Sequence, residues 1–242
     1  MISLMDTRYQ DSELTQANEC AIVLQNCWKG AMEKVIEEIK DCVLEFDRDS
    51  INNKVQEALD AGIEAQNILN NGLIGAMAEV GRRFEEGEFF VPEMLVAART
   101  MQTGLAYLKP QLMEAGIESA GKVALGTVKG DLHDIGKNLV GMMLEGAGFE
   151  VIDLGVDVPA EKFVEAVKAG NINIIGLSAL LTTTMPNMKS TIDALKEAGL
   201  RNSVKVMLGG APLTDAYANE AGADGYAADA SRAVKLAKSL IT

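Results

Sequence analysis

The sequence of 242 residues predicts a two-part fold, in which an N-terminal four-helix bundle precedes a doubly wound α/β sheet of five parallel strands. From about residue 28 to residue 116, apolar residues recur with the period of an amphipathic helix. After about residue 120, short apolar runs alternate with helical stretches, the pattern of βαβ units with right-handed crossovers. The length suits one or two domains, and a composition of 48% apolar and 24% charged residues is that of a globular protein.

The first part is predicted to hold four helices joined by short connections, which indicates an antiparallel bundle. Pro92 suits the first position of the fourth helix, Glu93 lies at its positive end, and the helix is expected to end near Leu108, before Pro110. The expected helices occupy about residues 30–46, 49–63, 68–84 and 92–108. We define residues 29–116 as the helical domain, preceded by an extension, residues 1–28, of unknown role.

The second part, residues 121–242, is predicted to contain five strands that alternate with helices. Five such units suit a flavodoxin-like sheet with the strand order 2-1-3-4-5. Asp229 is expected to cap the last helix, and residues 115–121 form a small, polar boundary with the first part. The expected strands are residues 122–128, 150–154, 172–178, 204–208 and 225–227, and the clearest helices are 134–146, 160–169 and 187–198.

The charge balance excludes several classes of partner. The formal net charge of −13 repels phosphate backbones and anionic membrane surfaces, so we expect neither nucleic-acid nor membrane binding. Neither a signal peptide nor a spanning segment of about 20 apolar residues is recognisable.

The three cysteines, Cys20, Cys27 and Cys42, are a poor disulfide framework and fit a reducing compartment, so we expect a cytoplasmic protein. A metal site at Cys20 and Cys27 is less favoured than buried thiols, because no close cysteine pair or histidine completes it.

The predicted sheet places a ligand beyond the carboxyl ends of its strands, at the switch point between strands one and three. The loops at this edge are residues 130–138, 178–184 and 209–212, and the only histidine of the chain, His133, lies in the first of them. A structural role for this imidazole is one interpretation. However, Asp131 could accept a hydrogen bond from Nδ1 and aim Nε2 outward, as in metal-ligating histidines. A single protein ligand is too few for a zinc site, but it suits a metal that a macrocycle already holds.

The glycines argue against nucleotide binding, since neither G-x-G-x-x-G nor a phosphate-binding P-loop is present. The pair Gly209–Gly210 indicates instead that a bulky ligand approaches the backbone. The motifs Asp131-x-His133-x-x-Gly136, Ser178-x-Leu180 and Gly209-Gly210 together resemble the signature of the cobalamin-binding domain. Residues 87–95 and 97–101 resemble the helical cap domain of the same family. Over about residues 30–242, the chain is therefore similar to the corrinoid proteins of anaerobic methyltransferase systems and to the cobalamin module of methionine synthase.

This resemblance implies a Rossmann-like second domain and assigns roles to particular residues. His133 would replace the dimethylbenzimidazole base as the lower ligand of cobalt, Asp131 would hold His133, and Ser178 would hold Asp131. The other implied cofactor-binding residues are Leu132, Asp134, Ile135 and Gly136 beside the histidine, Leu180, Thr182, Thr183 and Thr184 along the slot for the cofactor tail, Gly209, Gly210 and Ala211 with backbone clearance, Tyr226, Ala227, Asp229 and Ala230 at the far end, and Val91 and Met94 in an apolar lid.

Several of these residues also have ordinary structural interpretations. Leu180 suits any buried strand end, and the three threonines suit a plain loop. Asp229 could be a helix cap only, and Met94 and Met101 have the spacing of core residues.

The resemblance further implies a methyl carrier that cycles between Co(I) and methyl-Co(III) and is not an enzyme by itself. A substrate-specific methyltransferase would load it, an acceptor methyltransferase acting on tetrahydrofolate or coenzyme M would unload it, and a reductive activator would rescue Co(II). The cap must then move, so we expect a hinge near residues 115–121. The methyl donor stays open among methanol, methylamines, glycine betaine and aromatic methyl ethers, as do the acceptor and the oligomeric state.

Two other functions use similar motifs. A cobalamin-dependent transcriptional sensor needs a DNA-binding module, but the residues before position 30 are few and lack basic character. A cobalamin subunit of a carbon-skeleton mutase needs a substrate barrel and usually lacks this cap.

Overall fold

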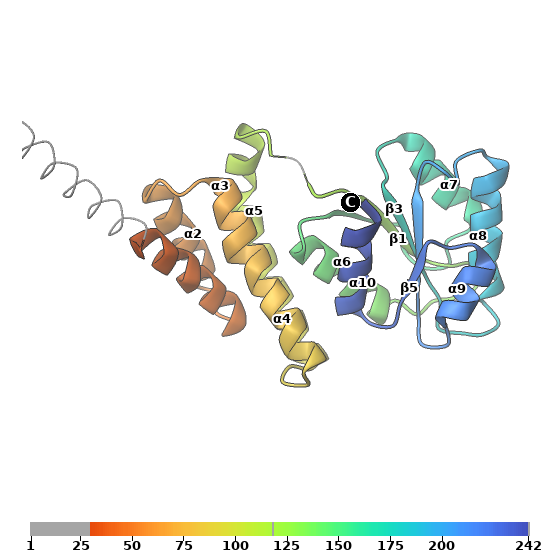
Figure 1. The fold of residues 1–242 in the computed structure, drawn as a ribbon, viewed down its shortest axis with the longest axis horizontal. Helices are drawn as coiled ribbons and strands as arrows, with labels where there is room; N and C mark the ends of the chain where they lie inside the picture. Colours follow the sequence, from red (N-terminus) through yellow and green to blue (C-terminus); the bar gives the residue numbers. More distant parts are fainter. Residues whose placement is uncertain (1–29, 118, 242) are drawn as a thin grey trace, which may run out of the picture.

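The computed structural model describes residues 30–117 and 119–241. The chain forms a helical domain followed by an α/β domain, as the sequence predicts (Figure 1). The predictions for the N-terminal extension, Cys20 and Cys27 lie outside the described residues. None of the helices in the described ranges combines the length and the apolar character that crossing a membrane requires.

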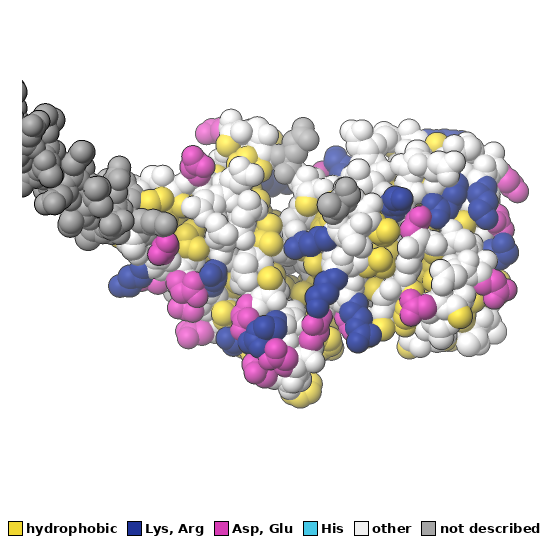
Figure 2. Space-filling model, in the orientation of Figure 1, with side chains coloured by type: hydrophobic (Ala, Val, Ile, Leu, Met, Phe, Trp, Pro, Cys, Tyr) yellow, Lys and Arg dark blue, Asp and Glu magenta, His cyan; other side chains and the backbone are white. Residues whose placement is uncertain are grey.

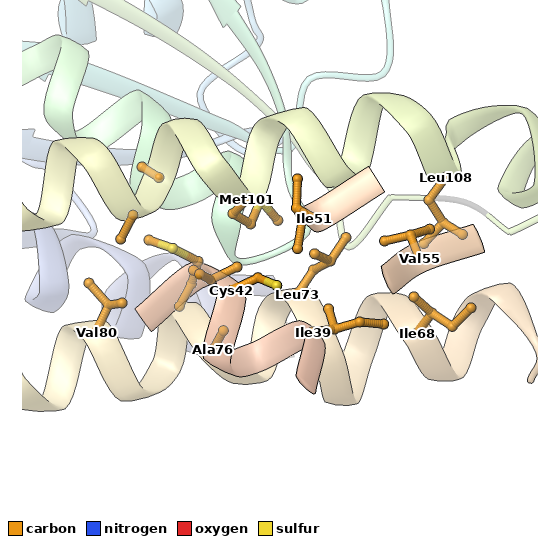
Figure 3. Packing of buried hydrophobic residues seen from close by; sticks show 14 of the residues in the cluster. Ile39, Cys42, Ile51, Val55, Ile68, Leu73, Ala76, Val80, Met101 and Leu108 are labelled. Carbon is orange, nitrogen blue, oxygen red and sulfur yellow. The ribbon is translucent and has the colours of Figure 1, made fainter. Parts of the chain in front are cut away.

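The helical domain consists of four helical segments within the described residues. These are residues 30–44, α2 (Ile51–Asp60), a long helix made of α3 (Ala65–Asn67), the π-helical stretch η1 (Ile68–Ile74) and α4 (Gly75–Glu85), and finally α5 (Val91–Glu114). Their apolar faces meet in one core, where Ile39, Ile51, Leu73, Met101 and Leu108 are fully buried (Figure 3). The periodic apolar residues of the sequence thus form the interior of this domain.

Helix α5 is longer than predicted. The expectation that it ends near Leu108 is wrong, because the helix runs through Pro110 to Glu114. Proline removes one helical hydrogen bond, but Leu112, one half-turn later, is buried against the core, and this packing holds the last turn in the helix. At the other end, the backbone N–H of Phe90 donates to the Glu93 carboxylate at 3.0 Å, which fixes the start of α5.

The α/β domain contains a parallel sheet with the predicted order β2-β1-β3-β4-β5. The strands are β1 (Lys122–Thr127), β2 (Glu150–Asp153), β3 (Ile174–Ser178), β4 (Lys205–Gly209) and β5 (Gly225–Ala227). The register aligns Thr127 with Ser178, Ser178 with Gly209, and Gly209 with Ala227. The carboxyl ends of four neighbouring strands therefore lie in one row, where a ligand site is expected.

Helices cover both faces of this sheet. Helices α6 (Ile135–Gly146) and α10 (Ala230–Ile241) pack on one face, between the sheet and the helical domain (Figure 1). Helices α7 (Ala160–Ala169), α8 (Pro186–Glu197) and α9 (Asp215–Ala221) pack on the other. Asp229 caps α10 as predicted, since its carboxylate accepts the N–H of Arg232 at 2.8 Å.

The two domains meet through α4 and α5 on one side and α6 and α10 on the other. The carboxylate of Glu85 accepts hydrogen bonds from the Ser231 hydroxyl at 2.8 Å and the Lys235 ammonium at 2.7 Å. The side chain of Met77 lies against the backbone of Gly146, where an added Cβ would be only 3.0 Å from the Met77 side chain. A cavity of about 270 Å³ remains along this junction, and charged side chains flank the junction in the space-filling view (Figure 2).

Candidate functional site

A cavity of about 570 Å³ opens at the carboxyl ends of β1, β3, β4 and β5 and penetrates between the sheet and helices α6 and α10. Its floor is apolar and includes Leu125, Gly176 and Met207, which are register partners in adjacent strands. Its mouth is formed by the loops after the strands, and Phe84 and Val91 reach it from the helical domain. This cavity thus lies where the topology of the sheet predicts a ligand.

His133 stands at the mouth of this cavity with its side chain 51% exposed. Its Nδ1 lies 2.7 Å from Oδ1 of Asp131, and the same oxygen accepts the backbone N–H of His133 at 3.1 Å. An ionised carboxylate only accepts hydrogen bonds, so we assign the ring proton to Nδ1. The lone pair of Nε2 is then available to a ligand, in the tautomer that a metal-binding histidine needs.

Asp131 is fully buried beneath the histidine, and donors surround its carboxylate. Oδ2 accepts the N–H groups of Leu180 at 2.8 Å and Leu181 at 3.2 Å, and the hydroxyl of Thr184 at 2.7 Å. Burial by itself raises the pKa of Asp131, but the hydrogen bonds from Thr184, His133 and Leu180 outweigh burial and hold the pKa well below its usual range. Asp131 is therefore an anion at neutral pH and fixes the orientation of the imidazole.

The third member of this chain of hydrogen bonds is Thr184, and the prediction that Ser178 holds Asp131 is wrong. The described donors to the Asp131 carboxylate belong to His133, Leu180, Leu181 and Thr184. Ser178 is the last residue of β3 and lies on the wall of the cavity. The turn after β3 brings Thr184 beneath the loop that carries His133. Thr184 lies six residues after Ser178, the predicted partner of Asp131.

A second threonine, Thr127, supports the same loop from below. It is fully buried at the end of β1, and its hydroxyl donates to the backbone carbonyl of His133 at 3.0 Å. Sequence reasoning missed this contact, because threonine is common in strands and its presence at a strand end does not by itself indicate a special role.

Most of the residues predicted to bind a cofactor do line the cavity. Gly210 has a specific backbone reason to be glycine: its φ is 141°, and an added Cβ would lie 1.9 Å from the carbonyl oxygen of Ala179. At Gly209 the nearest atom would be 3.7 Å away, so backbone packing does not demand a glycine there. The predicted residues at the cavity are Val91, Leu132, His133, Asp134, Ile135, Gly136, Ser178, Leu180, Gly209, Gly210, Ala211, Ala227, Asp229 and Ala230.

Six other predicted residues do not line the cavity. Asp131 and Thr184 lie beneath His133 and orient it. Thr182 and Thr183 lie in an exposed turn before α8. Tyr226 packs with the core beneath α7, α8 and α9, because side chains alternate along β5 and its neighbour Ala227 takes the cavity side. Met94 is fully buried in the core of the helical domain, so its assignment to a lid is wrong and the core interpretation holds.

Sequence reasoning also missed most of the deeper lining of the cavity. The motifs lie in the loops, whereas these residues lie in the strand interiors and on the helix faces behind them. Alternation along β1, β3 and β4 was the signal that could have found Leu125, Gly176 and Met207. The other missed lining residues are Phe84, Lys137, Leu139, Val140, Leu177, Ala179, Leu208, Ala228 and Ala233.

The chemistry of the site is that of a single exposed imidazole beside a large apolar cavity. No group of three or more His, Cys, Asp or Glu side chains that could hold a metal ion occurs in residues 30–117 and 119–241. A metal bound to His133 must therefore bring most of its own ligands, as a macrocyclic cofactor does. The cavity, the free Nε2 and the apolar floor fit such a group.

Known proteins share both domains. Residues 121–235 and residues 35–109 each match a family described as a B12 binding domain. The dimethylamine corrinoid protein of Methanosarcina barkeri is 46% identical over 86% of this chain and 98% of its own length. A cobalamin-binding protein from Desulfitobacterium hafniense, known from a crystal structure, is 37% identical in sequence to this chain. The two structures match with a TM-score of 0.72 over 85% of this chain and 98% of that one. The methanol:cobalamin methyltransferase complex of Methanosarcina barkeri contains a chain that is 32% identical, with a TM-score of 0.78 over 86% of this chain and 80% of that one.

Proposed function

The chain belongs to the family of B12-binding corrinoid proteins, and from that premise we propose that it binds cobalamin through His133 and carries a methyl group between two methyltransferases. The observation that carries the proposal is the 2.7 Å contact between Nδ1 of His133 and the buried Asp131 carboxylate at the mouth of a 570 Å³ cavity. In this proposal Nε2 of His133 is the cobalt ligand, and the benzimidazole of the cofactor is displaced from cobalt.

When bound, cobalamin supplies the methyl-transfer chemistry at its cobalt, and the protein supplies orientation and access. Asp131 holds the proton of His133 at Nδ1, and Thr184, Leu180 and Leu181 hold the carboxylate. A change in the ligand at Nε2 changes the basicity of the imidazole ring. The proton that is held or released is therefore the one at Nδ1 of His133, beside the Asp131 carboxylate. The apolar cavity beneath the histidine would take the displaced nucleotide tail of the cofactor.

The partners in this proposal are a substrate-specific methyltransferase that loads the carrier, an acceptor methyltransferase that unloads it, and a reductive activator. The solved complex of a related chain with a methanol:cobalamin methyltransferase supports the first of them. Several apolar side chains that line the cavity are exposed, with Leu132 at 70%, Ile135 at 80% and Leu180 at 44%. Such a rim suits contact with a large cofactor and with a protein partner above it.

The test is the visible absorption spectrum of the full chain after reconstitution with hydroxocobalamin and desalting, compared with His133→Ala. We expect a retained corrinoid band whose position differs between the two proteins. Loss of the band from the unmutated protein would overturn cobalamin binding. Identical bands in both proteins would remove His133 from the cobalt. Met113→Ala is the control, because it truncates an exposed side chain that does not line the cavity and leaves the imidazole in place.

The carrier role has its own test. The reduced holoprotein is treated with radiolabelled methyl iodide and desalted, and the label retained on the protein is counted. We expect about one label for each bound corrinoid, which is the stoichiometry of a single cobalt site. Retention of the corrinoid without the label would contradict methyl carriage and leave cobalamin binding intact.

A further inference from the structure

The connection between β2 and α7 contacts the His133 loop, although it lies outside the cavity. Its central residue is Asp157, whose Oδ1 accepts the N–H of Gly130 at 2.6 Å. The backbone N–H of Asp157 donates in turn to the carbonyl of Asp131 at 2.9 Å. One residue therefore binds two consecutive residues of the turn that precedes His133, once through its side chain and once through its backbone.

Asp157 holds an uncommon backbone conformation. Its φ is 52°, and only Phe46 and Asn171 share a positive φ among the non-glycine residues that the structure describes. Such a conformation costs free energy in any residue with a Cβ, although aspartate tolerates it better than most. Glycine would avoid that cost and is used at ten other positive-φ positions of the described chain. What glycine cannot supply is the carboxylate that accepts the N–H of Gly130.

The same connection also holds the far end of the His133 loop. Lys137, in the first turn of α6, is almost completely buried, with its side chain 3% exposed. Its ammonium lies 2.6 Å from Oδ1 of Asp153, at the end of β2, and that oxygen also accepts the N–H of Gly155 at 2.9 Å. Both ends of residues 130–137 are therefore attached to the short stretch 153–157.

We propose that Asp157 is a positioning residue for His133. Asp131 is held from two sides: Leu180 and Thr184 bind its carboxylate, and Asp157 binds its backbone. Without the Asp157 contacts the turn can rotate, and the carboxylate no longer meets Nδ1 at the fixed distance that selects one tautomer. The inference rests on the proposed function only in that the Nε2 kept free is the one assigned to cobalt.

The experiment uses the apoprotein and ¹⁵N NMR of its imidazole, which is unambiguous because the full chain contains a single histidine. The ring ¹⁵N shifts report the ratio of the Nδ1–H to the Nε2–H tautomer. Asp157→Gly keeps the positive φ and removes the carboxylate, while Asp157→Asn keeps both an acceptor oxygen and tolerance of the conformation. Asn171→Gly controls for the effect of placing glycine at a positive φ. Asn171 has a φ of 66° and is not among the residues that bind the loop. Lys162→Ala is the control for the connection itself, because it removes a 2.9 Å bond to the Leu154 carbonyl.

We expect Asp157→Gly to lower the Nδ1–H to Nε2–H ratio by roughly two- to tenfold, in the lower part of the range of coupling within one hydrogen-bond network. Asp157→Asn and both controls should keep the ratio of the unmutated protein. A folded Asp157→Gly protein with an unchanged ratio would overturn the proposal, as would an Asp157→Asn protein that behaves like Asp157→Gly. The measurement needs no corrinoid. Failure of the proposed function would show separately, as loss of the corrinoid band from the unmutated protein.

Discussion

The hydroxyl of Thr184 donates a 2.7 Å hydrogen bond to the same buried carboxylate of Asp131 whose other oxygen holds the imidazole of His133. Thr184 is itself buried, and its backbone N–H donates to the carbonyl of Leu181 at 3.0 Å. It therefore links the turn after β3 to the loop after β1, which are separate in the sequence. The ring of His133 is oriented by residues from both sides of the switch point.

The first prediction concerns this hydroxyl. Thr184→Val keeps the shape of the side chain and removes the donor, so a buried carboxylate oxygen loses one of its three hydrogen bonds. We expect the free energy of unfolding to fall by about 1.5–3 kcal/mol, as for other hydrogen bonds to charged groups. We also expect the corrinoid band of the reconstituted protein to shift toward that of His133→Ala. Urea unfolding followed by circular dichroism and the visible spectrum provide the two measurements.

Two variants separate this role from a general effect of mutation. Thr184→Ser restores the hydroxyl and should restore both properties. Ser178→Ala removes the hydroxyl that the sequence analysis had placed against Asp131, and it should leave the orientation of His133 unchanged. If Ser178→Ala shifts the corrinoid band as strongly as Thr184→Val does, the assignment of the contact to Thr184 is wrong.

The second prediction concerns pH. Hydrogen bonds hold the pKa of Asp131 in the folded protein below the value of about 3.9 for an unfolded chain. The stabilisation from this carboxylate is therefore complete above about pH 4 and is lost as the pH falls from there toward the folded-state pKa. Asp131→Asn should lower the free energy of unfolding at pH 7 and flatten its decline below pH 4. Urea titrations at several pH values test this, with Asp134→Asn in the same loop as the control. Parallel pH curves for Asp131→Asn and the unmutated protein would contradict the prediction.

The third prediction distinguishes the two glycines of the β4 loop. Gly210→Ala would place a Cβ within 1.9 Å of the Ala179 carbonyl, at a φ that disfavours any side chain, and should destabilise the fold by roughly 2 kcal/mol or more. Gly209→Ala meets nothing closer than 3.7 Å and should fold normally. Because Gly209 lines the cavity, its new methyl group should still weaken cobalamin retention. Thermal unfolding and equilibrium dialysis with hydroxocobalamin measure the two effects. Normal retention by a folded Gly209→Ala protein would show that the cofactor does not approach this glycine.

The fold was predictable from the sequence because each part repeats one simple pattern. Alternating strands and helices permit few topologies once crossovers are right-handed, and the observed strand order is the predicted one. The end of α5 was not predictable from local signals. Pro110 is an ordinary sign of a helix end, and only the burial of Leu112 in the assembled core overrides it.

The site was predictable where short motifs determine local geometry, and it was not where the tertiary fold brings distant residues together. Asp131 and His133 are two residues apart, so a turn of the chain suffices to join them. The choice between Ser178 and Thr184 depends on the path of the chain after β3, which the motif does not specify. Tyr226 was misplaced because its side depends on the phase of alternation along a strand of only three residues.

The last prediction concerns the contact between the two domains. Hydrogen bonds from Lys235 and Ser231 lower the pKa of Glu85, so this contact should persist through the ordinary glutamate range near about pH 4.3 and weaken only in stronger acid. Glu85→Gln should change global stability by less than about 1 kcal/mol, because the partner lysine is exposed. It should nevertheless speed hydrogen exchange at the C-terminal end of α4 and the N-terminal end of α10, where Glu85 links the two helices. Glu86→Gln is the matched control, since Glu86 directly follows α4 and pairs with Arg82 of the same helix, not with the α/β domain. Equal exchange rates in the two variants would mean that Glu85 does not hold the helical domain against the α/β domain.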